Sequence, residues 1–301
     1  MNGELILRCG DFSYSVEPHP VQWPAGASEP SVCGLAERDG ALYVASRNPL
    51  WPVMVFGAGG GFLRGFGREL QFGRTHGLQL EEDGSVFVCD DGRHVIHHLD
   101  AEGTLLSTLG TLDQPSDNGY DPSVPWPHDL YTVRRAGEPF NRPTGITRAA
   151  DGRLYIADGY GNAAVHRFSP EGKHEKTWGG PGSEPGKLRL PHAIREDGRG
   201  RIWVCDRENF RVQIYGADGS FIHGIERMDR PSDCWFDGAY MYVIEAFGFL
   251  SVYDMDFGLA ARIGYAHSML ENAHSITGDR HGNLYVGYIN GARTLIRLKR
   301  I

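Results

Sequence analysis

The sequence lacks any long apolar run and any long basic run. No segment approaches the roughly 20 consecutive apolar residues that a helix needs to cross a bilayer. Its 38 acidic residues outnumber its 30 lysines and arginines, which gives a formal net charge of −8. An acidic balance without a basic run argues against nucleic acid as the main partner. We therefore expect this protein to bind neither nucleic acid nor membrane.

Paired cysteines and a secretion signal are also missing. The five cysteines are dispersed, and no two of them form a CxxC motif. Cys89 and Cys205 end equivalent apolar runs, which predicts that they are small core residues. The segment Met1–Arg8 contains Glu4 and lacks a basic start followed by a long apolar run, so we predict no signal peptide. These observations favour a reducing compartment and predict a cytoplasmic protein.

Sustained helical periodicity is absent, whereas turn residues are abundant, with 41 glycines and 17 prolines. The stretch Asn141–Tyr215 reads twice through one pattern of short apolar runs separated by Asp-Gly turns. The first copy covers Pro143–Phe168 and the second covers Pro191–Tyr215. A unit of several short strands that recurs about every forty residues is typical of a propeller blade.

The repeats predict an all-β fold, a six-bladed β-propeller in which residues 1–301 form a single domain. The last repeat ends one outer strand short, and strand-like runs at Leu5–Arg8 and Phe12–Val16 precede the first repeat. We therefore expect an N-terminal strand to close the last blade. A segment at about 111–142 interrupts the regular spacing of the repeats. It is too long for a link between blades, which indicates a functional insert.

Three histidines occupy one position in alternate repeats. His76, His192 and His274 stand at the starts of the second, fourth and sixth repeats, and Thr144 takes this position in the third. The first strand of each blade starts near the axis of a propeller, so we predict that the three imidazoles converge on one point. A single histidine in such a turn more often bonds to the backbone of its own blade. Three in register favour a catalytic zinc site, which uses three protein ligands and keeps one position open.

A second register follows the second strand of each repeat. It contains Arg47, Tyr160 and Arg207, each one or two residues beyond that strand. The aspartates in this register, such as Asp158, are expected to cap turns by accepting backbone N–H groups. The residues after them point more freely and can reach a ligand held at the metal. A phenolate is stabilised beside guanidinium groups, so Tyr160 is suited to act as a base.

Five motifs together resemble one known family. They are THGL at 75–78, DGYGN at 158–162, LPH at 190–192, DREN at 206–209 with Arg211, and the repeat start at His274. In these motifs, and from about Gly34 to its end, the chain resembles the catalytic core of peptidyl-α-hydroxyglycine α-amidating lyase. That core is built of NHL repeats. The resemblance implies an NHL-type propeller with an axial zinc ion and a nearby structural calcium. It also implies cleavage of a carbinolamide C–N bond, which yields an amide and glyoxylate.

Carried over residue by residue, the resemblance assigns roles that agree with the two registers. The three in-register histidines become the zinc ligands, and Tyr160 becomes the general base. Arg47 and Arg207 become the groups that orient the substrate and stabilise its charge. The chemistry suits these residues, because a hydroxyl polarised by zinc loses its proton more easily and can collapse to a carbonyl.

The chain also departs from the family around its third histidine. The family has Met-Pro-His-Asp there, whereas Asn272 and Ser275 replace the Met and the calcium-binding Asp. A calcium ion would then depend on backbone carbonyls such as that of Leu78. We assign substrate-binding roles to Asn272 and to Trp126 and His128 of the insert, which would cover a pocket for a small-molecule substrate. A secreted peptide is a less fitting substrate, because the sequence shows neither a signal peptide nor a hydroxylating partner domain.

We therefore predict a zinc-dependent lyase that acts on a small α-hydroxy-amide. Two other classes of function stay open. One is a metal-dependent hydrolase of lactones or esters, although axial carboxylate and amide sets suit calcium better than a histidine-rich set does. The other is a non-catalytic NHL module that binds a protein or peptide.

Overall fold

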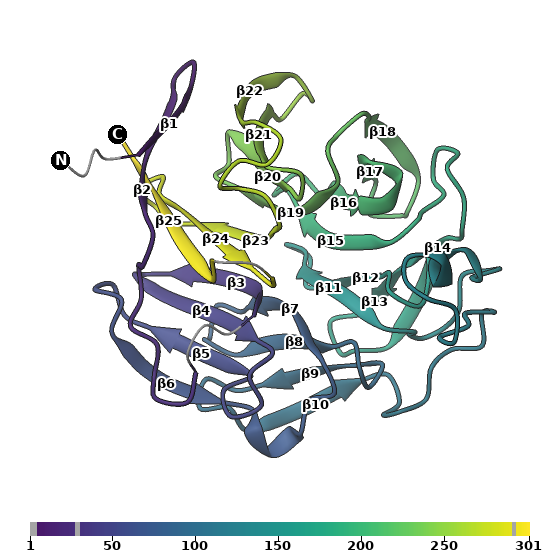
Figure 1. Cartoon of the computed structure of the whole chain (residues 1–301). Coiled ribbons are helices and arrows are strands. Elements are labelled where there is room, and N and C mark those ends of the chain that lie inside the picture. Colours follow the sequence, from purple (N-terminus) through teal and green to yellow (C-terminus); the bar gives the residue numbers. More distant parts are fainter. Residues whose placement is uncertain (1–4, 28–30, 291–292) are drawn as a thin grey trace. The chain divides into compact units, whose positions relative to one another are not determined.

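The strands of this chain form six antiparallel sheets, each built mainly from consecutive strands. The computed structural model describes residues 5–27, 31–290 and 293–301 (Figure 1). Over these residues it contains one five-stranded and five four-stranded sheets, and its helices are three short 3₁₀ turns. The fold is an all-β propeller with six blades, so the fold class predicted from the repeats is confirmed. No helix in the described ranges has the length and apolar character needed to cross a membrane.

The Asp-Gly turns that marked the repeats join the first two strands of their blades. In the third blade, the Ala149 N–H donates to the Arg153 carbonyl and the Gly152 N–H donates to the Ala149 carbonyl, at 2.9 and 2.8 Å. Gly152 has a φ of 85°, a left-handed conformation that glycine adopts without steric cost. The Asp151 carboxylate accepts the Arg153 N–H at 3.0 Å, as aspartate does in tight turns.

The chain divides into two compact units, and the first contains Met1–Gln71 and Ser232–Ile301. Two of its sheets are made of consecutive strands: β3 (Val32–Arg38), β4 (Ala41–Ser46), β5 (Val53–Phe56) and β6 (Phe62–Phe66), and then β19 (Pro231–Phe236), β20 (Tyr240–Glu245), β21 (Phe249–Asp254) and β22 (Leu259–Gly264). Its third sheet has the order β1-β2-β25-β24-β23, from β1 (Ile6–Cys9), β2 (Phe12–Glu17), β23 (Ala273–Gly278), β24 (Leu284–Tyr288) and β25 (Leu295–Arg300). The turn η1 (Arg68–Leu70) follows β6.

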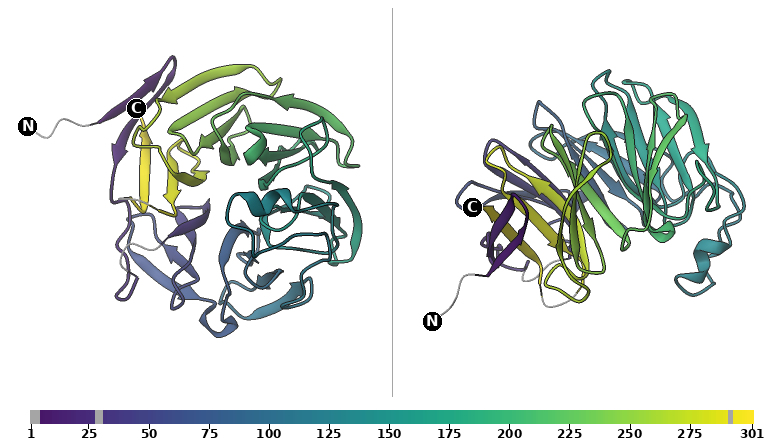
Figure 2. Two further views of the ribbon diagram at one scale, coloured as in Figure 1. Left: turned by 45° about the vertical axis from the view of Figure 1, so that its right-hand side comes forward. Right: turned by 90° about the horizontal axis from the view of Figure 1, so that it is seen from above.

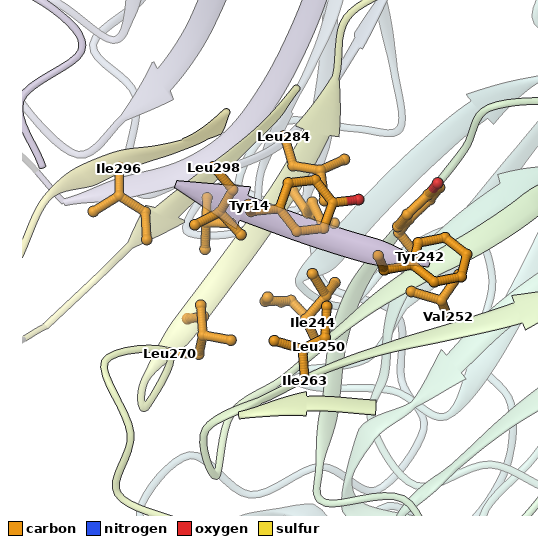
Figure 3. Packing of buried hydrophobic residues seen from close by; sticks show 14 of the residues in the cluster. Tyr14, Tyr242, Ile244, Leu250, Val252, Ile263, Leu270, Leu284, Ile296 and Leu298 are labelled. Carbon is orange, nitrogen blue, oxygen red and sulfur yellow. The ribbon is translucent and has the colours of Figure 1, made fainter. Parts of the chain in front are cut away.

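The N-terminal strand β2 completes the last blade, as the sequence predicted. It pairs antiparallel with β25, with Tyr14 opposite Arg300 and Glu17 opposite Arg297. Tyr14 is fully buried and packs with Leu284 and Leu298 in the core of this unit (Figure 3). The first strand-like run forms β1, which adds a further strand at the edge of the same sheet.

The second unit, Phe72–Pro231, contains the other three sheets. Their strands are β7 (Thr75–Leu80), β8 (Val86–Asp90), β9 (Val95–Leu99) and β10 (Leu105–Leu109); β11 (Pro143–Arg148), β12 (Leu154–Asp158), β13 (Ala164–Phe168) and β14 (His174–Gly179); and β15 (Pro191–Glu196), β16 (Ile202–Asp206), β17 (Arg211–Tyr215) and β18 (Phe221–Ile225). The turn η3 (Arg207–Asn209) joins β16 to β17. The continuous apolar runs β8, β12 and β16 are entirely buried, whereas β10 and β18 are mostly exposed.

The insert lies between β10 and β11 in this second unit. It contains the short turn η2 (His128–Tyr131), which stands clear of the strands in the right-hand view of Figure 2. Two apolar side chains attach the insert to the sheets, because Leu130 packs with Tyr160 and Leu190, and Val133 joins the core between the third and fourth blades. The insert therefore covers the region where Tyr160 lies.

The first strands of these three sheets, β7, β11 and β15, pack closely on one another. Gly77 lies where β7 approaches the backbone of β11. A Cβ atom added at Gly77 would lie 2.5 Å from the Thr144 carbonyl oxygen and 2.9 Å from the Gly145 Cα. Both neighbours are backbone atoms that cannot move aside cheaply. The close approach of β7 to β11 therefore requires glycine at this position, next to His76.

We expect Gly77→Ala to lower the free energy of unfolding by about 1–3 kcal/mol, the usual cost of overpacking a tight contact. Urea unfolding followed by circular dichroism measures this change. Gly59→Ala is the matched control, because a Cβ at Gly59 meets no atom within 4 Å. Equal midpoints for the two variants would contradict the tight strand contact.

Candidate active site

His76 is held in one tautomer by the neighbouring strand. It is the second residue of β7, and its side chain is almost wholly buried. Its Nδ1 lies 2.6 Å from the backbone carbonyl oxygen of Thr144, the second residue of β11. A carbonyl can only accept, so Nδ1 carries the proton and donates it. In the neutral imidazole, Nε2 is then left with a lone pair directed away from the strand contact.

The phenol oxygen of Tyr160 lies between two histidine nitrogens. It is 3.3 Å from Nε2 of His76 and 3.1 Å from Nε2 of His192. The two imidazole rings are themselves 4.8 Å apart, centre to centre. A phenol has one proton and can donate it to only one of these nitrogens at a time. Three groups that can bind or transfer a proton therefore meet at one buried point within the second unit.

A tight turn after β12 brings Tyr160 to this point. Gly159 packs so closely on the start of β15 that an added Cβ would lie 2.2 Å from the Pro191 carbonyl oxygen. The Tyr160 N–H donates to the Arg142 carbonyl oxygen at 3.4 Å, which ties the turn to the residue before β11. The Tyr160 ring is buried against Leu130 and Leu190.

His274 is the second residue of β23 in the first unit and is also buried. It has the same position in its strand as His76 and His192 have in theirs. His76, His192 and His274 are thus all buried, and each offers a ring nitrogen that can bind a metal. That His274 joins the other two at one metal ion stays a prediction.

Arg207 and Trp126 both lie beside Tyr160. Arg207 begins η3 directly after β16, and its guanidinium carbon is 5.7 Å from the centre of the Tyr160 ring and 5.7 Å from that of Trp126. Its Nε donates to the Glu208 carboxylate at 3.0 Å. The rings of Trp126 and Tyr160 are 6.0 Å apart, and Trp126 is about half exposed. The insert thus contributes an aromatic side chain to the rim of this site.

Two further arginines at Tyr160 were missed by the sequence reasoning. The guanidinium carbons of Arg74 and Arg142 lie 4.6 and 5.5 Å from the centre of the Tyr160 ring, within cation–π range. Both also approach the buried carboxylate of Asp91, with N–O distances of 2.6 and 3.7 Å. The signal was present in the register, because each stands two residues before the position shared by His76 and Thr144.

The aspartates of the second register lie within hydrogen-bond networks of their own blades. Asp158 accepts the Asn141 N–H at 2.7 Å and the Asn162 side-chain amide at 2.8 Å. Asp206 accepts the Arg189 N–H at 2.6 Å and the Arg211 Nε at 2.9 Å. Burial raises the pKa of Asp206 to about 6 despite these donors. These carboxylates therefore fix the turns that present Tyr160 and Arg207.

The remaining predicted residues are not joined to Tyr160 by the described contacts. His128 is exposed at the start of η2, and no described hydrogen bond or ring contact links it to Tyr160. Arg47, which follows β4, and Asn272, which precedes β23, belong to the first unit. Their roles toward substrate stay predictions. A calcium ion at the Leu78 carbonyl also stays a prediction; Leu78 lies in β7 opposite Val88.

Comparison with known proteins agrees with the repeats and the motifs. The NHL repeat family matches residues 140–168 and 188–215, which cover β11–β13 and β15–β17. Peptidyl-glycine alpha-amidating monooxygenase A of Xenopus laevis is 32% identical over 178 residues, 56% of this chain and 17% of that protein. A probable peptidyl-alpha-hydroxyglycine alpha-amidating lyase of Caenorhabditis elegans is 29% identical over 151 residues, 48% of this chain and 38% of that protein. The aligned region thus spans less than half the length of either relative.

Solved structures show the same architecture. A gluconolactonase of Xanthomonas campestris superposes with a TM-score of 0.63 over 100% of this chain and 98% of its own, at 16% identity. This likeness shows the fold alone. The chain is an NHL-repeat propeller that resembles the amidating lyases in sequence.

Proposed function

We propose that this protein is a zinc-dependent lyase that cleaves the C–N bond of a small α-hydroxy-amide. The proposal rests mainly on the position of the Tyr160 phenol oxygen, which lies within 3.3 Å of Nε2 of both His76 and His192. The sequence likeness to amidating lyases supports the reaction class. The aspartates and glycines that hold Tyr160 in place support a fixed rather than incidental geometry.

The donor set fits zinc. His76 donates its Nδ1–H to a backbone carbonyl, an arrangement that metal-binding histidines almost always show, and this leaves Nε2 as the ligand atom. His192 presents its own Nε2 to the same point, and we propose His274 as the third ligand. When bound, zinc supplies a Lewis acid that makes a nearby hydroxyl more acidic.

Tyr160 and the arginines account for the remaining chemistry. Tyr160, as the base, takes the proton from the carbinol hydroxyl of the substrate. The oxygen electron pair then forms the C=O bond of glyoxylate and the C–N bond breaks. The proton that the Tyr160 phenolate took passes to the leaving nitrogen, which becomes a primary amide. Arg207, with Arg47 as its proposed partner, holds the carboxylate next to the reacting carbon. No water is consumed in these steps.

The insert and the cysteines suggest the setting of the reaction. Trp126 and Leu130 of the insert lie against the Tyr160 ring and limit the room beside it, which favours a small substrate. None of the five cysteines forms a disulfide. We therefore propose a cytoplasmic enzyme that acts on a small molecule.

The reaction is tested with N-acyl-α-hydroxyglycine in water labelled with ¹⁸O. We expect a primary amide and glyoxylate as products, and an amide that carries no label. A hydrolase would instead release a carboxylic acid that contains ¹⁸O, and the lactonase alternative predicts labelled acid from a lactone such as gluconolactone. Absence of amide release from the metal-loaded protein would contradict the lyase, and lactone turnover would then favour the rival.

A further inference from the structure

A cleft of about 630 Å³ lies in the second unit, between the second blade and the insert. Its lining includes Arg74, Asp91 and His94 from the second blade, and Tyr120 and Arg142 from the insert. This volume is within the usual range for small-molecule sites. The residues that we assign to the proposed reaction do not line this cleft, so that reaction gives the cleft no role.

The cleft and the Tyr160 site share a wall. Arg74 and Arg142 line the cleft, and their guanidinium groups also lie over the ring of Tyr160 at 4.6 and 5.5 Å. A substrate that extends past these two guanidinium groups would therefore have its reacting end near Tyr160 and its other end in the cleft.

Arg142 is oriented by a short chain of hydrogen bonds. Its Nη1 donates to the phenol oxygen of Tyr120 at 3.0 Å, and that phenol donates to the Asp129 carboxylate at 3.0 Å. Asp129 is buried at the start of η2. The guanidinium is thus fixed by the insert before any ligand arrives, which lowers the entropic cost of binding one.

The charges of the lining favour a single negative charge. Arg74 and Arg142 contribute two positive charges, and the buried Asp91 between them contributes one negative charge. Burial keeps the pKa of His94 below its ordinary value, so this imidazole adds no charge near neutral pH. At the rim, Asp117 is paired with Arg135 at 3.0 Å. Two guanidinium groups that share one buried carboxylate can pair with one further carboxylate better than with a phosphate dianion.

We propose that this cleft binds a second carboxylate, located on the acyl side of the substrate. The substrate is then an α-hydroxyglycine amide of a short dicarboxylic acid. The carboxylate of its hydroxyglycine part faces Arg207, and the carboxylate at the far end of its acyl group faces Arg74 and Arg142. This inference rests on the proposed lyase function and adds the class of acyl group.

Two isosteric substrates test the inference, N-succinyl-α-hydroxyglycine and its neutral analogue N-succinamoyl-α-hydroxyglycine. We expect kcat/KM to favour the succinyl compound by about tenfold or more, because only it brings a charge to the arginines. In Arg142→Gln this preference should fall to about one, and Arg142→Lys should keep part of it because the charge is retained. Arg153→Gln, which removes an exposed charge from the third blade, should leave the preference unchanged.

The outcomes separate this inference from the lyase itself. If both compounds are cleaved at equal efficiency, the second subsite is wrong and the lyase function stands. If neither is cleaved, calorimetric titration with succinamate tests the cleft alone, with neutral succinamide as the control. Binding of succinamate that weakens about tenfold or more in Arg142→Gln supports the subsite. Equal binding to wild type and variant, or no binding, overturns it.

Discussion

Tyr160→Phe is expected to lower kcat by about 10²–10⁴-fold, the usual contribution of a positioned acid–base group. The substitution removes only the phenol oxygen, which lies within 3.3 Å of both histidine nitrogens. The aromatic ring that packs on Leu130 and Leu190 remains, so the free energy of unfolding should change little. Steady-state turnover of an N-acyl-α-hydroxyglycine measures the effect.

Zinc content and a second tyrosine variant make this result specific. The zinc bound per chain should be the same in Tyr160→Phe as in wild type, because the phenol is not one of the proposed ligands. Tyr265→Phe removes an exposed phenol and should keep the wild-type kcat. A Tyr160→Phe enzyme with undiminished kcat would exclude the phenol as the base.

The blades could be predicted from sequence because their signals are local. The turn glycines Gly152 and Gly198 have φ values of 85° and 73°, and in each repeat an Asp-Gly pair announces this conformation directly. The runs between these turns are continuous and apolar, which predicts strands that are buried on both faces. Closure by β2 followed from a count of strands in the last repeat, a simple consequence of the repeating unit.

The register relates Arg142 to the histidine position, but its left-handed backbone could not be predicted from its residue type. Arg142, Leu190 and Asn272 all precede the first strand of a blade and have φ values of 69°, 64° and 63°. Of these three, only asparagine commonly marks the left-handed region. The position is set by the packing of the blade, so its geometry is a tertiary effect.

The contacts of the insert could not be predicted from the periodicity of the sequence either. Its contacts with the sheets depend on single side chains such as Leu130 and Val133, and these residues belong to no repeated sequence pattern. Length and composition indicated that the segment has a function, but not which groups it brings to Tyr160. The sequence predicted a substrate-binding role for Trp126, but the contacts of Trp126 with Tyr160 and of Tyr120 with Arg142 become visible only in the folded insert.

His192→Ala is expected to abolish zinc binding and turnover together. The substitution removes one of the proposed ligands, and with two imidazoles left the site should hold zinc far more weakly. Elemental analysis of untagged protein should then fall from about one zinc per chain to near zero. Added zinc at about 100 times its Kd should stabilise the wild type by about 2.7 kcal/mol and leave the variant unchanged.

The third ligand is tested in the same way by His274→Ala. His274 lies in β23, in the unit that does not contain Tyr160, and its second position in that strand repeats those of His76 and His192. If the three imidazoles hold one ion, His274→Ala should lose zinc as fully as His192→Ala does. His281→Ala, at an exposed turn of the same blade, should retain both metal and activity. A His274→Ala protein that keeps a full equivalent of zinc would separate this histidine from the metal and leave a site of different composition in the second unit.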